Sequence, residues 1–113
     1  MSVPVPLEEL PEQIERFGPH AYIVTVGAEG RPRATSVSVF WHEALLKVAA
    51  GRRTAANVSG NDQVALLWPA PEPGEHALLV DGLGAVHDSP GEGPTVLVQP
   101  AKAVLHVTTP ARV

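Results

Sequence analysis

The chain has 113 residues, 44% of them hydrophobic, and its 12 acidic side chains outnumber its 8 lysines and arginines, for a net charge of −4. This length predicts one domain, spanning residues 1–113, and the absence of cysteine excludes a disulfide scaffold. The acidic balance argues against a dedicated nucleic-acid-binding protein, which needs surplus positive charge to displace counterions from phosphates.

The first recognisable element is an amphipathic helix near the N-terminus. Residues 7–17 carry large apolar side chains at steps of three and four, the spacing of one helix face: Leu7, Leu10, Ile14 and Phe17. Proline is tolerated in a first helical turn, so Pro11 predicts that the regular helix begins near Leu10 and ends before Gly18. We expect the apolar stripe to pack, either by capping the end of the fold or by joining an interface between subunits.

The remaining segments have the composition and alternation of β-strands. Six strands are expected, at residues 21–26, 33–41, 44–50, 63–68, 76–87 and 95–107, with a short helix at 51–60 after the third strand. Gly82 and Gly84 predict a bulge or a sharp bend, and Pro100 confines the middle of the last strand to an edge or a bulge. The pattern predicts a mostly β fold, a closed or nearly closed antiparallel barrel.

Several common functional motifs are missing from the sequence. It has no P-loop, no complete dinucleotide-binding glycine motif and no nucleophile elbow around a serine. Its five histidines lack the spacing of metal ligands and no cysteine could join them, so no metal site is expected. No secretory signal or membrane-spanning stretch is visible, so we expect a cytoplasmic protein without membrane or nucleic-acid partners.

Positive charge is concentrated in one short part of this acidic chain. The residues from Arg31 to Arg53 include five bases and one acid, a net charge of +4, whereas the rest of the chain sums to −8. Such a concentration attracts a small anion through its local field. The alternative is a solvated hairpin with scattered, exposed arginines.

The turn at residues 49–58 is the strongest candidate site within this basic part. A strand is expected to end just before Gly51 and a helix to begin just after it, which would expose unpaired amide donors suited to a phosphate. Arg52 and Arg53 would add charge-assisted hydrogen bonds, Thr54 a hydroxyl group, and Asn57 an amide one turn later. The alternative is an ordinary helix start with two exposed arginines.

The two tryptophans leave their roles open. Trp41 and Trp68 each end an expected strand, and an indole ring can stack on a flat cofactor or pack in a core or a dimer contact. Packing is favoured for Trp41, and both roles stand for Trp68.

Three segments in order resemble the pyridoxamine 5′-phosphate oxidase-like proteins, the flavin- and deazaflavin-binding split barrels. They are TVGAEGRPRATSVSVFW at 25–41, GRRTAANVSGNDQVALLWP at 51–69 and ALLVDGLGAV at 77–86. The resemblance implies a six-stranded split barrel that forms a homodimer. It also implies flavin mononucleotide (FMN), or an 8-hydroxy-5-deazaflavin coenzyme, in a groove between the subunits.

The resemblance also implies where the cofactor would lie. Its phosphate would be held by the second strand and by the turn after the third. The positions that correspond are Thr35, Ser36, Val37, Ser38, Val48, Ala49, Ala50, Gly51, Arg52, Arg53 and Thr54, with Asn57 beyond them and Trp68 as a candidate for ring stacking.

The chain departs from the family pattern at several cations. Many members carry Arg or Lys where Thr35, Phe40, Thr54 and Ala56 stand here, which leaves Arg52 and Arg53 as the main phosphate partners. The residues that bind substrate phosphate in a true pyridoxamine phosphate oxidase are not visible either. The resemblance implies a flavin- or deazaflavin-dependent oxidoreductase acting on a small substrate. The missing cations favour two alternatives, a carrier without turnover and a dimeric barrel with a vestigial groove.

Overall fold

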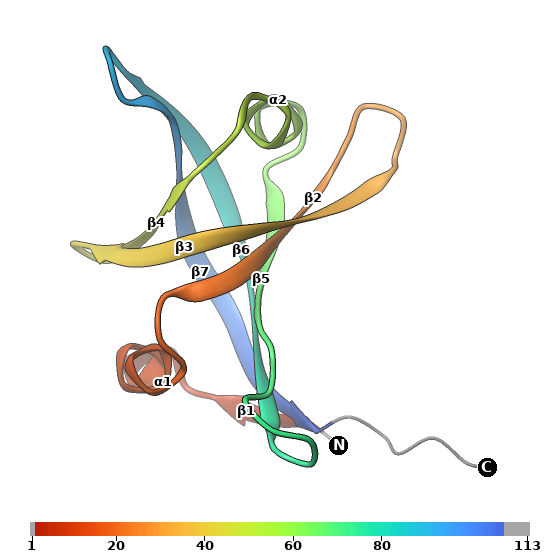
Figure 1. Ribbon diagram of the computed structural model, residues 1–113, viewed down its shortest axis with the longest axis vertical. Coiled ribbons are helices and arrows are strands. Elements are labelled where there is room, and N and C mark those ends of the chain that lie inside the picture. The colour runs from red at the N-terminus through yellow and green to blue at the C-terminus, as the bar shows by residue number, and fades with distance from the viewer. Residues whose placement is uncertain (1, 108–113) are drawn as a thin grey trace.

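The computed structural model describes residues 2–107 (Figure 1). Its elements in chain order are β1 (Ser2–Val5), a 3-10 turn η1 (Leu7–Glu9), α1 (Leu10–Phe17), β2 (His20–Val26), β3 (Pro32–His42), β4 (Leu45–Ala49), α2 (Arg52–Gly60), β5 (Gln63–Trp68), β6 (His76–Ser89) and β7 (Gly93–Val107). The six expected strands and two expected helices are all present. No helix in this range combines the length and apolar character needed to cross a membrane.

The strands form an antiparallel barrel. They follow the order β7-β4-β3-β2-β5-β6, and a long β6–β7 ladder closes the ring. The predicted fold class, a mostly β six-stranded barrel with two short helices, is confirmed. Strand β1 was not predicted, and it pairs outside the ring with Ala103–His106 of β7. Its four residues carry no strand signal because they include Pro4 and bury only Val5.

Helix α1 begins where the proline predicted. Pro11 lies in its first turn, and Leu10 and Ile14 are buried against the barrel. The expected stripe is shorter than predicted, because Leu7 belongs to the preceding 3-10 turn and is 43% exposed. The helix ends at Gly18, whose φ of 85° suits glycine and turns the chain into β2.

The barrel interior holds one continuous apolar core. Alternate residues of each strand point inward, and the largest fully buried side chains are Trp68, Leu10, Ile23, Leu46, Leu66 and Leu78. The predicted irregularity occurs where β6 crosses β7, with a register shift between Asp81 and Gly82 opposite Pro100. A Cβ atom at Gly82 would lie 2.6 Å from the Gln99 carbonyl oxygen, so this close crossing requires glycine.

Strand β3 has two different partners along its length. Its first part, Pro32–Ser38, pairs with β2, and its last part, Val39–His42, pairs with β4. Strand β4 then ends at Ala49, and the chain leaves the sheet through α2 (Figure 1). Among the described strands none pairs with the β4-side edge of β3 over Pro32–Ser38, and this open edge is the split in the barrel.

Candidate functional site

The first turn of α2 leaves its backbone donors open. Gly51 precedes the helix in an extended conformation, with φ −77° and ψ 170°, and no side chain caps the helix. The Ala55 amide donates to the Gly51 carbonyl over 3.0 Å. The amides of Arg52, Arg53 and Thr54 come before this bond and have no acceptor within the helix. They therefore present a partial positive charge, which favours an anion.

The side chains of this turn divide between solvent and core. Arg52 and Arg53 are exposed and free to meet a ligand, whereas Thr54 is only 4% exposed and lies on the face of α2 that packs on the barrel with Val58. The Thr54 hydroxyl group therefore sits on the packed side of the helix. At this turn the backbone amides and the two guanidinium groups are the donors that face outward.

Asn57 connects α2 to the end of β2. Its Nδ2 donates a hydrogen bond of 3.1 Å to Oγ1 of Thr25, a β2 residue that is 1% exposed. Gly27 lies beside this bond: a Cβ atom there would be in ordinary contact with the Asn57 Oδ1 atom, at 3.4 Å. The bond fixes the distance between the helix and the β2–β3 hairpin.

The expected β3 residues lie on two faces of the strand. Thr35 and Val37 pair with β2 residues that point into the barrel, whereas Ser36 and Ser38 share the outer face. Val48 is fully buried, so the backbone is the only part of it that can meet a ligand. Beyond it, Ala49 is exposed and Ala50 packs against the core.

Trp68 lies away from the other expected site residues. Its side chain is 1% exposed, and its Nε1 donates a hydrogen bond of 2.9 Å to the carbonyl of Gly18 at the end of α1. The ring therefore packs in the core and offers no free face for stacking. Trp41 remains 36% exposed at the end of β3.

A groove between α2 and the β2–β3 hairpin brings together arginines that are distant in sequence. It encloses about 290 Å³ and is lined by Gly27, Ala28, Glu29, Arg31, Pro32, Arg33, Arg53 and Asn57. A neighbouring hollow of about 550 Å³ shares Gly27, Ala28 and Asn57 with it. The sequence analysis counted Arg31 and Arg33 in the basic segment but did not place them in the site. The charge concentration was the available signal, and the fold shows which arginines converge.

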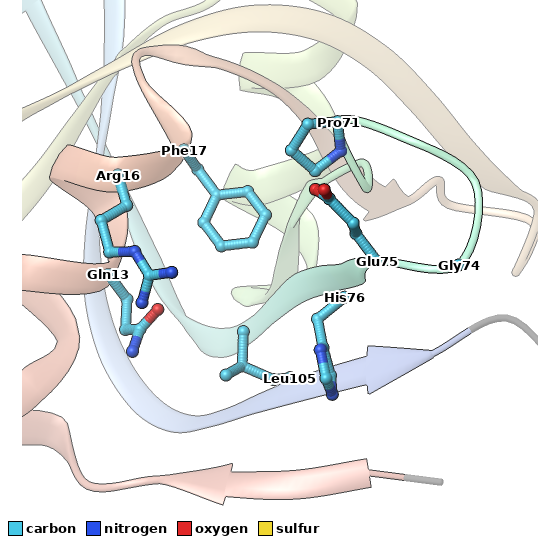
Figure 2. A pocket seen from close by; sticks show the side chains of 8 residues that line it. All are labelled: Gln13, Arg16, Phe17, Pro71, Gly74, Glu75, His76 and Leu105. Atoms are coloured by element: carbon cyan, nitrogen blue, oxygen red, sulfur yellow. The ribbon is translucent and has the colours of Figure 1, made fainter.

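A different hollow lies at the opposite end of the barrel, between α1 and the β5–β6 loop. It encloses about 410 Å³, and Figure 2 shows Phe17 at its centre, with Arg16 and Gln13 of α1 on one side and Glu75 on the other. The charges around it have opposite signs, so it selects no sign of ligand charge. Among the described residues no group of three or more His, Cys, Asp or Glu side chains could hold a metal ion.

Known proteins of similar sequence come from mycobacteria. No protein-family model matches the chain. The chain is 31% identical over 100 residues to the uncharacterized proteins Mb0449c of Mycobacterium bovis and MT0457 of Mycobacterium tuberculosis, over 78% of this chain and 70% of each relative. At this identity and coverage the chain belongs to the same family as these two proteins.

Solved structures share the fold at lower identity. A Clostridium acetobutylicum protein of the pyridoxinephosphate oxidase family, related to general stress protein 26, aligns with a TM-score of 0.69 and 12% identity, over 91% of each chain. An F420 reductase aligns with a TM-score of 0.61 and 17% identity, over 75% of this chain and 88% of its own.

HutZ, the heme storage protein of Vibrio cholerae, has a TM-score of 0.69 and 15% identity, over 88% of this chain and 94% of its own. At these identities the structures establish the architecture that the chain shares with them. The resemblance read from the sequence is thus confirmed in the fold. The chain belongs to the family of the two mycobacterial proteins, and it shares the split-barrel fold of the pyridoxamine 5′-phosphate oxidase-like proteins.

Proposed function

We propose that this protein binds FMN, or an 8-hydroxy-5-deazaflavin coenzyme, at the split of the barrel and acts as an oxidoreductase on a small substrate. The observation that carries the proposal is the uncapped start of α2, with exposed Arg52 and Arg53, beside the open edge of β3. The fold shared with an F420 reductase supports the deazaflavin alternative.

The residues present fit a phosphate-bearing flat cofactor. The amides of Arg52, Arg53 and Thr54 and the two guanidinium groups would bind the phosphate. Ser36 and Ser38, on the outer face of β3, would offer hydroxyl groups to another part of the cofactor. The bound ring would supply hydride transfer, and the protein's part is to position it and to exclude competing reactions.

A carrier that binds the cofactor without turnover is the second candidate. Threonine stands at 35 and 54, where many family members have cations, and Thr54 is buried on the packed side of α2. The side chains that face outward at the site are serines and arginines, and no histidine or carboxylate stands among the proposed cofactor residues as a candidate acid or base. The fold similarity to a heme storage protein is in keeping with a binding role.

We also propose that a second copy of the chain completes the groove. Large apolar side chains remain exposed on the outside of the barrel: Tyr22 at 42%, Phe40 at 59% and Leu83 at 42%. Tyr22 and Phe40 lie on the outer face of β2 and β3, the face that carries Ser36 and Ser38. A partner over this face would cover the apolar side chains and supply a second wall for the flat ring.

The dimer is tested by placing a charge on this face. The variant Phe40→Glu should be a monomer in light scattering while the wild type is a dimer, because an unpaired carboxylate is costly to bury at an interface. Glu75→Gln, on the β5–β6 loop, is the control and should remain a dimer. A monomeric wild type would contradict the proposed dimer.

Cofactor binding is tested by fluorescence titration with FMN and with the deazaflavin coenzyme. Arg53→Ala should weaken binding by about tenfold to a hundredfold, the loss of one charge-assisted hydrogen bond. Lys47→Ala is the matched control, since Lys47 faces a different hollow with His42 and His87 and should leave the affinity unchanged. Equal affinities in the two variants would contradict the phosphate assignment.

Turnover separates the enzyme from the carrier. The cofactor-loaded protein is mixed with a reduced nicotinamide cofactor, and the absorbance of the bound ring is followed. Bleaching of that absorbance, followed by its return when an acceptor is added, supports the oxidoreductase. A ring that stays bound to the protein but is not reduced by the nicotinamide cofactor supports the carrier.

A further inference from the structure

We propose that the groove lined by Arg31, Arg33 and Arg53 is a second anion site, separate from the site of the cofactor phosphate. It would take the carboxylate or phosphate group of a small substrate. This inference rests on the proposed function and deepens it, because it assigns the substrate a chemical class: a small molecule with an oxyanion group.

Arg31 and Arg33, at the β2–β3 hairpin, both lie toward α2. Arg33 pairs with Thr25 across β2 and β3, and paired residues lie on the same face of the hairpin. That face is turned toward α2, because Asn57 of the helix donates its hydrogen bond to Thr25. Arg31, in the turn just before β3, also lines the groove, and Arg53 borders it from the helix.

The groove carries a net positive charge. It contains three guanidinium groups and one carboxylate, that of Glu29, in a chain whose net charge is −4. Within residues 2–107, none of the side-chain hydrogen bonds uses any of these guanidinium groups. Three unpaired positive charges in a small hollow repel one another, and a bound oxyanion relieves that repulsion.

The base of the groove is held in place by backbone contacts. The Gly27 amide donates to the Arg31 carbonyl and the Gly30 amide to the Gly27 carbonyl, both over 2.9 Å. These bonds close the hairpin turn, and the bond of Asn57 to Thr25 fixes the opposite wall. At about 290 Å³ the groove has room for a phosphate or a small carboxylic acid.

The groove and the start of α2 are adjacent but distinct. The amides that would bind the cofactor phosphate precede Ala55, whereas the groove lies along the flank of the helix as far as Asn57, one turn later. Arg53 stands between the two positions and can serve either. Arg31 and Arg33 border only the groove and not the start of α2, so substitutions at these two residues distinguish the groove from the cofactor site.

The test therefore uses the full-length double variant Arg31→Ala/Arg33→Ala. Inorganic phosphate and succinate are each titrated by calorimetry into wild type and variant, with and without saturating FMN. We expect the FMN-saturated wild type to bind at least one of the two probes. The variant should bind that probe about tenfold or more weakly, from the loss of charge-assisted hydrogen bonds, with an unchanged affinity for FMN.

The control removes two positive charges elsewhere, in Arg16→Ala/Lys102→Ala, and should bind the probe like the wild type. Tighter binding of succinate would identify a carboxylate substrate, and tighter binding of phosphate a phosphorylated one. Equal probe affinities in wild type and Arg31→Ala/Arg33→Ala would overturn the site. So would phosphate binding that FMN abolishes, because the two anions would then share one position. If the wild type does not bind FMN, the cofactor proposal fails. The probe titrations made without FMN then still decide whether the groove binds an anion.

Discussion

The two ends of this barrel differ in whether their polar groups are paired within the protein. At the α1 end, Trp68 is buried and its indole N–H is satisfied by the Gly18 carbonyl, and the nearby hollow places Arg16 and Glu75 on either side of Phe17. At the α2 end, no side chain caps the start of the helix, and one edge of β3 is unpaired. Three arginines and one glutamate line a groove there. Figure 1 shows the two helices on opposite sides of β2 and β3 along the longest axis.

This difference separates stability from binding. At the α1 end the buried indole donor bonds to the protein's own backbone, so a substitution there should lower the free energy of unfolding. The α2 end leaves its first amides and its guanidinium groups without protein partners, so they are available to a ligand. Substitutions at the two ends should therefore affect different measurements, and each prediction below tests that separation.

The largest effect is expected from Trp68→Ala, because it removes a fully buried indole from the core of the α1 end. Urea unfolding should show a loss of about 3–5 kcal/mol in the free energy of unfolding. Trp68→Phe keeps most of the ring but leaves the Gly18 carbonyl without its donor, and should cost about 1–2 kcal/mol. FMN affinity should be the same in Trp68→Phe and wild type. A selective loss of FMN binding in that variant would place the tryptophan at the cofactor after all.

An intermediate effect is expected at the crossing of β6 and β7. Gly82→Ala would put its Cβ 2.6 Å from the Gln99 carbonyl oxygen and 2.7 Å from a Val98 methyl carbon. The backbone must move to admit the methyl group, at about 1–3 kcal/mol in the free energy of unfolding. Gly60→Ala makes the same chemical change at the end of α2, where a Cβ meets nothing within 4 Å. Equal melting temperatures of the two variants would contradict the close crossing.

The smallest effect is expected from the link between α2 and β2. Asn57→Ala removes the donor to the buried Thr25 hydroxyl group and should lower the free energy of unfolding by about 1 kcal/mol. Asn61→Ala is the matched control, because its Oδ1 accepts one exposed bond from the Gln63 amide, and it should cost less. Because Asn57 also positions the groove, its variant should weaken phosphate binding while Asn61→Ala does not. A variant that loses phosphate binding at unchanged stability would make Asn57 a direct ligand instead.

Local signals in the sequence were sufficient for most of the elements. The start of α1 followed from Pro11, and the irregularity of β6 and β7 from Gly82 and Pro100, because proline and glycine restrict the backbone wherever they stand. Strand β1 escaped prediction because four residues with one buried side chain carry no period. It exists because the second half of β7 extends past β4 and offers an edge.

The site was predictable only in part. The turn at Gly51 with Arg52 and Arg53 was visible, since a strand end, a glycine and a helix start are adjacent in sequence. The burial of Thr54 was not visible, because it depends on which face of α2 meets the barrel. Trp68 could be assigned to the core only once β5 was seen to bring it against the end of α1.

By itself, the sequence determined the mostly β fold, the order of its strands and helices, and the fact that its positive charge gathers between Arg31 and Arg53. These properties are local or additive, so periodicity, proline and glycine placement and charge counting are enough to find them. The tertiary structure alone decided that β3 changes partner at Val39 and opens the barrel, and that the hairpin arginines meet Arg53 across a groove. Those properties depend on pairing between distant segments, which the closure of the barrel fixes and no local pattern encodes.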